Sequence, residues 1–324
     1  EIKNPLGGIR GAAQLLARAK EYGSNQIDCA LFPQEAATAY KRVLLRNSGD
    51  DWYGPGSAGV ATMMKDAVFQ ELAKEMSFAV MAYRPTVVYI NGEYWGLHNL
   101  RESFDKHYFA TRYGLDPDNI DLLKQEEDPS DASKVFITND GGDVNADEEY
   151  RSLLAWVGAH ALSDDANFRQ LQTQVDVANY TDYVIAETFY ANTDWPQNNC
   201  GFWRAHTNQT AAAGASGDTR WRWMLSDLDK AGEQGYDFDM FAYLSNDART
   251  AVNQSAFLIN ELWKNAAYRS YFVSRYERLL NTLLRPERTS RLIAQAANIL
   301  APEMETHFRR WGRPYTQEQW RQAV

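Results

Sequence analysis

The chain has 324 residues, 44% of them hydrophobic and 23% charged, which is typical of a globular protein with a sizeable core and excludes a wholly disordered chain. Its 33 basic and 43 acidic residues give a formal net charge of −10, so we expect neither nucleic acid nor an anionic membrane as a partner. The two cysteines, Cys29 and Cys200, are too few for a disulfide framework or a thiolate zinc site, and no apolar run approaches the roughly 18 residues of a membrane span.

The chain opens with the sequence EIKNPLGGIRGAAQLL, in which Ile9, Leu15 and Leu16 have the spacing of an amphipathic helix. This stretch resembles the phosphoacceptor box of sensor histidine kinases, where the phosphorylated histidine stands immediately before Glu-Ile-Lys-Asn-Pro. The sequence begins at Glu1, without that histidine, and no Asp-x-Gly-x-Gly box of the partner ATPase domain follows. We therefore expect no histidine-kinase activity, leave the origin of residues 1–16 open, and leave the compartment open as well.

Strand and helix patterns alternate in the first part of the chain. KRVLLRNSGDDW, from Lys41 on, predicts a short apolar strand that ends in an Asn-Ser-Gly turn. TMMKDAVFQELAKEM places Met64, Val68, Phe69 and Leu72 at helical spacing. RPTVVYINGEYWGLHNLRESFD predicts a β-hairpin, because two strands rich in aromatic and β-branched residues flank an Asn-Gly turn.

Helical patterns dominate the second part of the chain. A short strand around residues 122–124 leads through an acidic loop to the Gly-rich linker TNDGGDVNADEE, where we expect a boundary between lobes. EEYRSLLAWVGAHAL and VANYTDYVIAETFYAN have helical spacing, RWRWMLSDLD alternates like a strand, and residues 256–310 predict several helices in series. We therefore predict an α+β fold, with a strand-rich N-terminal lobe in residues 17–140 and a helix-rich C-terminal lobe in residues 141–324.

Carboxylate and amide side chains gather among large aromatic residues in the segment ANTDWPQNNCGFWRA. Such polar groups are costly to bury unless something binds them. Asp194 and Asn199 are five positions apart, and Asp227 and Asp229 end the strand predicted after them. Phosphoryl transfer uses this order: one aspartate orients the substrate hydroxyl, an asparagine five positions on holds magnesium, and a later aspartate holds the magnesium that bridges the nucleotide phosphates. The alternative is structural, with a helix cap at Asp194 and an Asx turn at Asn199.

The rest of the predicted site is a cation for the phosphates and an aromatic wall. Lys124 is the candidate cation because it ends a short apolar run, and Glu102 in NLRESFD is the candidate to pair with it. A solvated strand end is the plainer interpretation of Lys124, and a helix cap or surface position is that of Glu102. Trp195, Phe202 and Trp203 are expected to wall the site, and the latter two to lie in the core as well. A glycine-rich loop with the pattern G-x-G-x-x-G covers the nucleotide in ordinary protein kinases. The NGEYWG hairpin lacks this pattern, and hairpin formation explains its sequence fully.

Several motifs, in their order along the chain, resemble those of the spore-coat CotH kinase family: LLRNSGDDW, MKDAVFQEL, VVYINGEYWGLHNLRE, NIDLLK, ANTDWPQNNCGFWR and WRWMLSDLD. FVSRYERLLNTLL and APEMETHFRRWG resemble that family's carboxy-terminal helices, so the resemblance extends over residues 17 to 312. It implies an atypical, bilobal protein-kinase-like fold that uses ATP with Mg²⁺ or Mn²⁺. It also implies a protein substrate that is phosphorylated on serine or threonine.

The resemblance assigns a role to each candidate residue. It carries Lys124 over to the phosphate-binding lysine and Asp194 to the catalytic aspartate. It carries Asn199 and Asp227 over to metal binding, and Asp229 to the second aspartate of the family's D-x-D. Which of these two aspartates faces the metal stays open.

The sequence departs from the family pattern at a few positions, and two alternative functions accompany the kinase. The family's usual Arg-Asp is Lys65-Asp66 here, and Ser226 and Lys230 stand where aromatic or apolar residues are common. The first alternative is a non-catalytic relative that keeps the fold as a cell-surface or coat-assembly scaffold. The second is a kinase that acts on small molecules through the same site.

Overall fold

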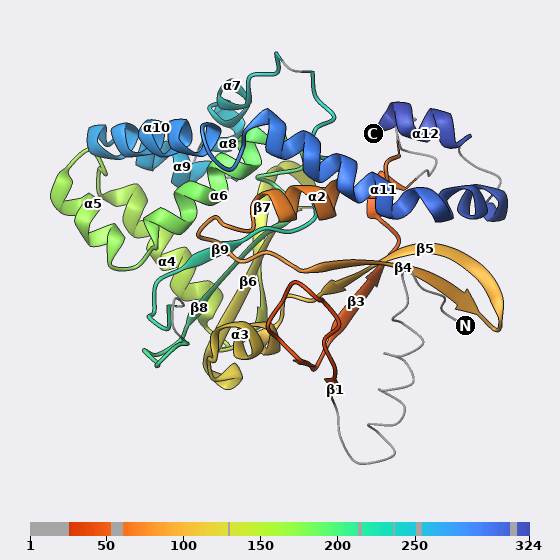
Figure 1. Ribbon diagram of the computed structural model, residues 1–324. Helices are drawn as coiled ribbons and strands as arrows, with labels where there is room; N and C mark the ends of the chain where they lie inside the picture. The colour runs from red at the N-terminus through yellow and green to blue at the C-terminus, as the bar shows by residue number, and fades with distance from the viewer. Residues whose placement is uncertain are drawn as a thin grey trace.

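The computed structural model describes residues 26–52, 61–128, 130–212, 216–235, 237–250, 255–311 and 316–324. Strands and helices follow one another through these ranges, and the predicted α+β class is confirmed (Figure 1). The helix expected within residues 1–16 lies outside the described residues. In the ranges that are described, no helix is long and apolar enough to cross a membrane.

The described strands form three antiparallel sheets. The first pairs β1 (Ile27–Asp28) with β2 (Ala39–Tyr40). The second has the order β3-β5-β4 and consists of β3 (Val43–Arg46), β4 (Tyr83–Ile90) and β5 (Glu93–Glu102). The third has the order β7-β6-β8-β9 and consists of β6 (Ile120–Asp128), β7 (Asp131–Gly141), β8 (Cys200–Ala205) and β9 (Arg222–Met224). Two of these strands, β3 and β9, lead directly into the candidate site.

The predicted hairpin is confirmed in β4 and β5. Asn91 (φ 52°) and Gly92 (φ 85°) form its turn, and a type I′ turn requires a positive φ at both positions. Helix α11 (Pro286–Trp311) packs on β5, where the Leu97 N–H donates to His307 Nδ1 at 3.0 Å. The hairpin is therefore held by helix α11.

The helices follow the apolar periodicity of the sequence. Where the spacing predicted helices, the structure has α2 (Lys65–Leu72), α4 (Ala146–Ala159), α6 (Val177–Phe189), α9 (Phe257–Trp263), α10 (Ala266–Leu280) and α11. The shorter helices are α3 (Lys106–Tyr113), α5 (Asp165–Gln172), α7 (Met240–Leu244), α8 (Asp247–Thr250) and α12 (Gln317–Ala323). Helix α6 is buried along most of its length in the largest core cluster. This buried helix ends just before the segment that carries Asp194.

The predicted acidic linker is shorter than its sequence indicated. Strand β7 extends into it, since Thr138 pairs with Lys124 and Gly141 pairs with Leu122 of β6. Residues 142–145 are what remains between β7 and α4. Cross-strand pairing overrides the low strand propensity of Asn, Asp and Gly in this segment, so the sequence pattern alone missed β7.

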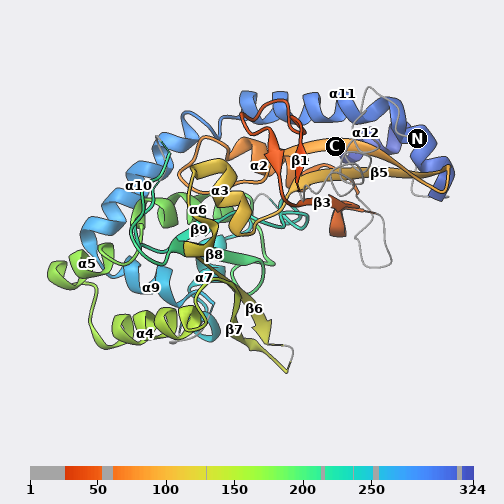
Figure 2. The same cartoon turned by 90° about the horizontal axis from the view of Figure 1, so that it is seen from below.

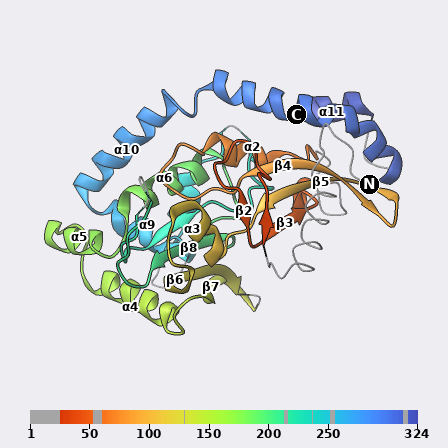
Figure 3. The ribbon, with the colours of Figure 1, turned by 60° about the horizontal axis from the view of Figure 1, so that its bottom comes forward.

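The C-terminal helices return to the N-terminal strands. Helices α10 and α11 run along one side of the molecule, and α11 passes beside β4 and β5 (Figures 2 and 3). Leu300 and Met304 of α11 share a buried cluster with Val68 of α2. Strands β6 and β7, in the predicted N-terminal lobe, also form one sheet with β8 and β9. The division at residues 140 and 141 stays a prediction, and hydrogen bonds and core packing both cross it.

Candidate active site

Asp194 and Asn199 come together in the segment between α6 and β8. The Asn199 Nδ2 donates to Asp194 Oδ2 at 3.1 Å, and the Asn198 Nδ2 lies 3.3 Å from Asp194 Oδ1. The Asp194 N–H donates to Asn192 Oδ1 at 3.2 Å. Asn199 has a φ of 59°, a left-handed conformation that asparagine tolerates better than most residues. The predicted catalytic aspartate and metal-binding asparagine are therefore direct neighbours.

Strand β6 fixes the position of this loop from one side. The Gln125 Nε2 donates to the Pro196 carbonyl at 2.6 Å, and the Glu127 N–H donates to Asn198 Oδ1 at 2.9 Å. Gln125 is buried. A buried side chain and the backbone of a central strand thus hold the loop, which limits the freedom of the carboxylate that follows α6.

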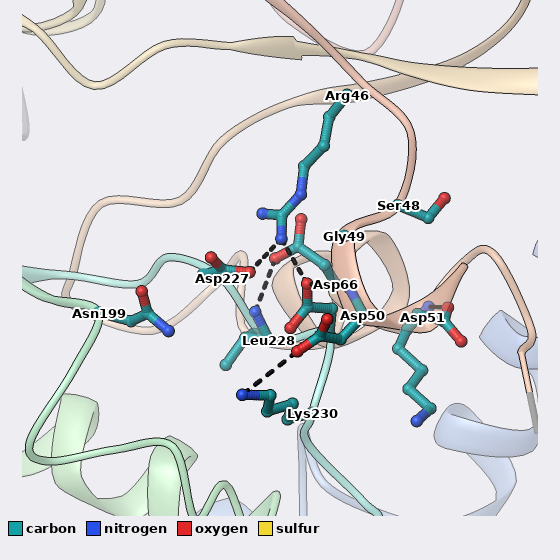
Figure 4. Close-up of polar contacts among 12 residues, drawn as sticks. Arg46, Ser48, Gly49, Asp50, Asp51, Asp66, Asn199, Asp227, Leu228 and Lys230 are labelled. Carbon is teal, nitrogen blue, oxygen red and sulfur yellow. Dashed lines mark hydrogen bonds and ion pairs between the residues drawn. The ribbon is translucent and has the colours of Figure 1, made fainter. Parts of the chain in front are cut away.

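Asp227 and Asp229 follow β9 and share one cation. The Arg46 guanidinium, at the end of β3, contacts the Asp227 carboxylate (Figure 4) and donates to Asp229 Oδ2 at 2.5 Å. The Asp50 N–H also donates to Asp229 Oδ2, at 2.7 Å. The Asp229 side chain is 7% exposed, and that of Asp227 is 34% exposed. Asp227 is therefore the more accessible of the two carboxylates.

The electrostatics of this pair favour a bound cation. Burial and the neighbouring Asp227 carboxylate raise the pKa of Asp229, while the Asp50 N–H and Arg46 lower it. Two carboxylates this close oppose each other's ionisation unless a positive charge lies between them. Arg46 supplies such a charge in this structure, and a divalent cation would supply a larger one.

The turn between the two aspartates is anchored by Asp66 of α2. The Leu228 N–H donates to Asp66 Oδ1 at 3.1 Å. The other Asp66 oxygen contacts the buried Arg101 guanidinium, and the Gln70 Nε2 donates to Asp66 Oδ1 at 2.8 Å. Burial alone would raise the pKa of Asp66, but Arg101 and Arg46 lower it below its usual range. Asp66 is therefore a buried anion that orients the backbone between the candidate metal ligands.

A tight loop after β3 covers Asp229. Gly49 has a φ of 60°, and a Cβ at this position would overlap the Asp229 carboxylate and the Arg46 guanidinium. Asp51 anchors this loop to the segment before α2, because its buried carboxylate accepts the Thr62 N–H at 2.7 Å and the Lys65 N–H at 2.9 Å. Glycine is required here because the backbone approaches the aspartate so closely.

Lys230 connects the loop that carries Asp194 with the loop after β3 that carries Asp50. Its Nζ lies 3.4 Å from Asp194 Oδ2 and 3.2 Å from Asp50 Oδ2. The Ser226 hydroxyl donates to the Asn199 carbonyl at 3.0 Å, which brings the loop of Asn199 next to Asp227. Segments that follow β3, α6 and β9 thus converge on one cluster of carboxylates, amides and cations.

Comparison with known proteins places this arrangement in a family. A family model described as CotH kinase protein matches residues 10–324. The chain belongs to the CotH kinase family. No curated protein matches it. The family assignment makes this a kinase-like protein, and it covers the strands, the helices and the converging loops described above.

The predicted pair of Glu102 and Lys124 does not form in this CotH-family chain. Glu102 does not pair with Lys124: Arg112 Nε donates to Glu102 Oε1 at 2.8 Å, and the Ala82 N–H donates to Glu102 Oε2 at 2.9 Å. The Lys124 ammonium pairs with Glu126 on the same strand. Glu102 is buried at the end of β5 in another sheet from Lys124, and its charge is matched by the nearer Arg112. The predicted Glu102–Lys124 pair was therefore wrong, and the nucleotide role of Lys124 stays a prediction.

The three aromatic residues expected to wall the site lie in the core. Trp195 packs edge-on against Tyr183 in the largest cluster, with ring centroids 5.9 Å apart. Phe202 belongs to the same cluster, and Trp203, on the opposite face of β8, belongs to another cluster. The expectation of core positions is confirmed for Phe202 and Trp203, and Trp195 is buried as well.

Among the residues of the site that carried no role in the sequence-based prediction are Arg46, Asp50 and Asp66. All three stand in motifs that contributed to the family resemblance, LLRNSGDDW and MKDAVFQEL. In a single sequence, a basic residue that ends a strand and an acidic residue in the first turn of a helix have ordinary structural explanations. The sequence signal that could have indicated a role for Arg46 is its position between an apolar strand and an Asn-Ser-Gly turn.

Glu187 supports the Asp194 loop from inside the core. It is 0% exposed at the end of α6, and its Oε2 accepts the Asn192 Nδ2 at 2.9 Å. Asn192 in turn accepts the Asp194 N–H. Burial raises the pKa of Glu187 to about 8, although the hydrogen bond from Asn192 lowers it. The side chain is therefore mostly neutral near pH 7.

Glu187→Gln is expected to increase the free energy of unfolding at neutral pH. The folded protein keeps a proton up to about pH 8 that the unfolded chain releases above about pH 4.5, so stability falls as the pH rises through this window. One unit of pKa corresponds to about 1.4 kcal/mol, and we expect a gain on the order of 2 kcal/mol at pH 7. Urea titrations across the window should show a weaker pH dependence in the variant. Glu277→Gln, on the exposed face of α10, should keep the parental slope, and an unchanged slope in Glu187→Gln would contradict the buried-acid assignment.

Proposed function

We propose that this protein is an ATP- and divalent-metal-dependent protein kinase of the CotH type, with a bilobal kinase-like fold, which phosphorylates serine or threonine of a protein substrate. The observation that carries the proposal is the convergence of Asp194 and Asn199 with Asp227 and Asp229. They stand on separate segments, after α6 and after β9, and Lys230 links them. A helix cap and an Asx turn do not account for this convergence.

Each residue of the cluster has a chemical task in this proposal. Asp194 accepts a hydrogen bond from the substrate hydroxyl and takes its proton during transfer. Asn199, Asp227 and Asp229 hold the metal through amide and carboxylate oxygens. The metal, when bound, neutralises charge on the nucleotide phosphates. Arg46 and the Asp50 N–H hold Asp229 in place.

The donor set fits a magnesium or manganese ion. Across the described ranges, no three His, Cys, Asp or Glu side chains gather into a complete metal site of their own. Mg²⁺ does not need one, because it keeps several waters and is bound by one or two carboxylates together with substrate phosphates. The Arg46 guanidinium already bridges the two carboxylates as a positive charge. The cluster is therefore suited to a cation that arrives with the nucleotide.

The same bridge favours one alternative, a non-catalytic scaffold. Arg46 pairs with both candidate metal ligands, and a protein that never binds metal would gain stability from that arrangement. The two functions differ in one measurable property. A kinase binds nucleotide together with the metal and is stabilised by it, whereas the scaffold is not.

Asp227→Ala is expected to abolish the rise in melting temperature that ATP and Mg²⁺ together produce, without unfolding the protein. Its side chain is the more exposed of the pair and receives no backbone hydrogen bond in the described contacts. Asp229→Ala should lose the same response and also lower the melting temperature without ligand, because the Asp50 N–H and Arg46 lose their acceptor. Thermal melting of each variant with ATP, Mg²⁺ or Mn²⁺, singly and combined, measures both effects.

The control for this experiment is Asp118→Ala, an exposed carboxylate outside the cluster, which should respond to ATP and Mg²⁺ like the parent. A parental response in both Asp227→Ala and Asp229→Ala would show that the metal site is elsewhere. If the parent does not respond and transfers no label from ATP to mixed serine-containing peptides, the scaffold is the better description.

A further inference from the structure

Lys230 has no assigned role, although it lies at the centre of the cluster. Its ammonium is 3.4 Å from Asp194 Oδ2 and 3.2 Å from Asp50 Oδ2, and Figure 4 shows its side chain directed toward Asp50. The family resemblance does not supply a function for it, because aromatic or apolar residues are common at this position. Its place in the fold must therefore explain it.

The other candidate cations occupy different places. The Arg46 guanidinium contacts the two carboxylates proposed as metal ligands. The Lys124 ammonium pairs with Glu126, and its side chain is 43% exposed. Within the described part of the chain, Lys230 is the basic side chain that contacts the Asp194 carboxylate. It is therefore the cation placed beside the proposed base.

Asp50 is a partner that Lys230 can readily exchange. The Asp50 side chain is 62% exposed, and exposed ion pairs contribute little to stability because water and salt screen them. An incoming phosphate presents more negative charge and three acceptor oxygens to the same ammonium. Lys230 can thus release Asp50 and keep its contact with Asp194.

We infer that Lys230 binds the terminal phosphate of ATP and is a catalytic residue of the proposed transfer. The inference rests on the proposed function, in which Asp194 orients the substrate hydroxyl. The transferred phosphorus must lie next to that hydroxyl, so a cation in contact with Asp194 lies beside the phosphate that moves. ADP lacks this phosphate and makes no such contact.

The step balances without a further reactant. The substrate hydroxyl oxygen forms a bond to the terminal phosphorus, and the bond from that phosphorus to the bridging oxygen of ADP breaks. The hydroxyl proton passes to Asp194. Lys230 keeps its protons and donates hydrogen bonds to the phosphoryl oxygens, which carry the charge in the transition state.

The test compares the affinities of ADP and of the non-hydrolysable β,γ-imido analogue of ATP, each with Mg²⁺, by calorimetry. Lys230→Met keeps the length of the side chain and removes its charge. We expect it to bind the analogue about ten- to a hundredfold more weakly than the parent does, as for a lost hydrogen bond to a charged group. Its affinity for ADP should stay parental, and Lys230→Arg should recover part of the loss.

Lys124→Met is the matched comparison, because the family resemblance assigns phosphate binding to that lysine. Equal losses for ADP and the analogue in Lys230→Met would assign a structural role to Lys230 and overturn the inference. Parental affinities for both nucleotides in Lys230→Met would also overturn the inference, whether or not Lys124→Met binds the analogue more weakly. A parent that binds neither nucleotide would overturn the proposed function and this inference together. A parent that binds both nucleotides, with no selective loss in Lys230→Met, would overturn this inference alone. Melting without nucleotide verifies that each variant is folded.

Discussion

Asp194→Asn is expected to lower the rate of phosphate transfer at least about a hundredfold, which is the low end of what a general base contributes. The substitution keeps the size of the side chain and an oxygen that can accept the Asn198 or Asn199 amide. It removes the charge that we propose accepts the hydroxyl proton. Because this charge acts mainly in the transition state, nucleotide affinity should change far less than turnover. Transfer of labelled phosphate and calorimetry with ATP analogues on the same preparation measure the two effects separately.

The control for Asp194→Asn is Asp118→Asn, which changes a carboxylate at the exposed Lys106–Asp118 pair and should keep parental transfer. The melting temperature of Asp194→Asn without ligand should stay near the parental value, since Asn192 and Glu187 still hold the loop. A parental transfer rate in Asp194→Asn would make this aspartate a structural loop residue and would support the scaffold alternative.

Local sequence patterns predicted the part of the site that is continuous in the chain. Asp194 and Asn199 were chosen as candidates because their spacing is fixed within one loop, and the structure brings them into contact. Asp227 and Asp229 were chosen as candidates because alternating tryptophans mark the strand before them. In both places the candidate residues are neighbours in the sequence, so a single chain reveals them.

Contacts between distant segments were harder to predict. Arg46 meets Asp227 across 181 positions, and Asp66 meets Leu228 across 162. No periodicity or turn signal encodes such a meeting, because it depends on how the sheets and α2 pack. The prediction of a Glu102–Lys124 pair was wrong for the same reason. The sequence contains the two opposite charges, but packing places Glu102 against Arg112 instead.

The fold shows the same contrast. Helix α6 and the β4–β5 hairpin follow apolar spacing and an Asn-Gly turn, so both were predicted. Strand β7 was missed because its polar end is ordered by pairing with β6 rather than by its own pattern. The return of α11 to β5 also lay beyond the sequence pattern, since it requires knowledge of which apolar faces meet.

Loss of either partner in the buried pair of Asp66 and Arg101 is expected to destabilise the fold by about 3–5 kcal/mol, because the other charge stays buried without its direct ion-pair partner. Arg101 is 1% exposed and Asp66 is 7% exposed. Arg101→Met leaves the carboxylate with Arg46 and Gln70, whereas Asp66→Asn leaves the guanidinium without a carboxylate. The double variant should be more stable than the sum of the two single losses predicts. Urea unfolding of all three measures the coupling.

The same pair should also affect the candidate active site, because Asp66 accepts the Leu228 N–H between the two candidate metal ligands. Asp66→Asn can keep that hydrogen bond, while Asp66→Leu cannot. At a temperature where both remain folded, Asp66→Leu should therefore lose the stabilisation by ATP and Mg²⁺, and Asp66→Asn should retain part of it. Lys106→Met, at the exposed Lys106–Asp118 pair, should leave unfolding and nucleotide response unchanged. Equal nucleotide responses in Asp66→Leu and the parent would mean that the aspartate turn keeps its geometry without Asp66, and the buried pair would then serve folding alone.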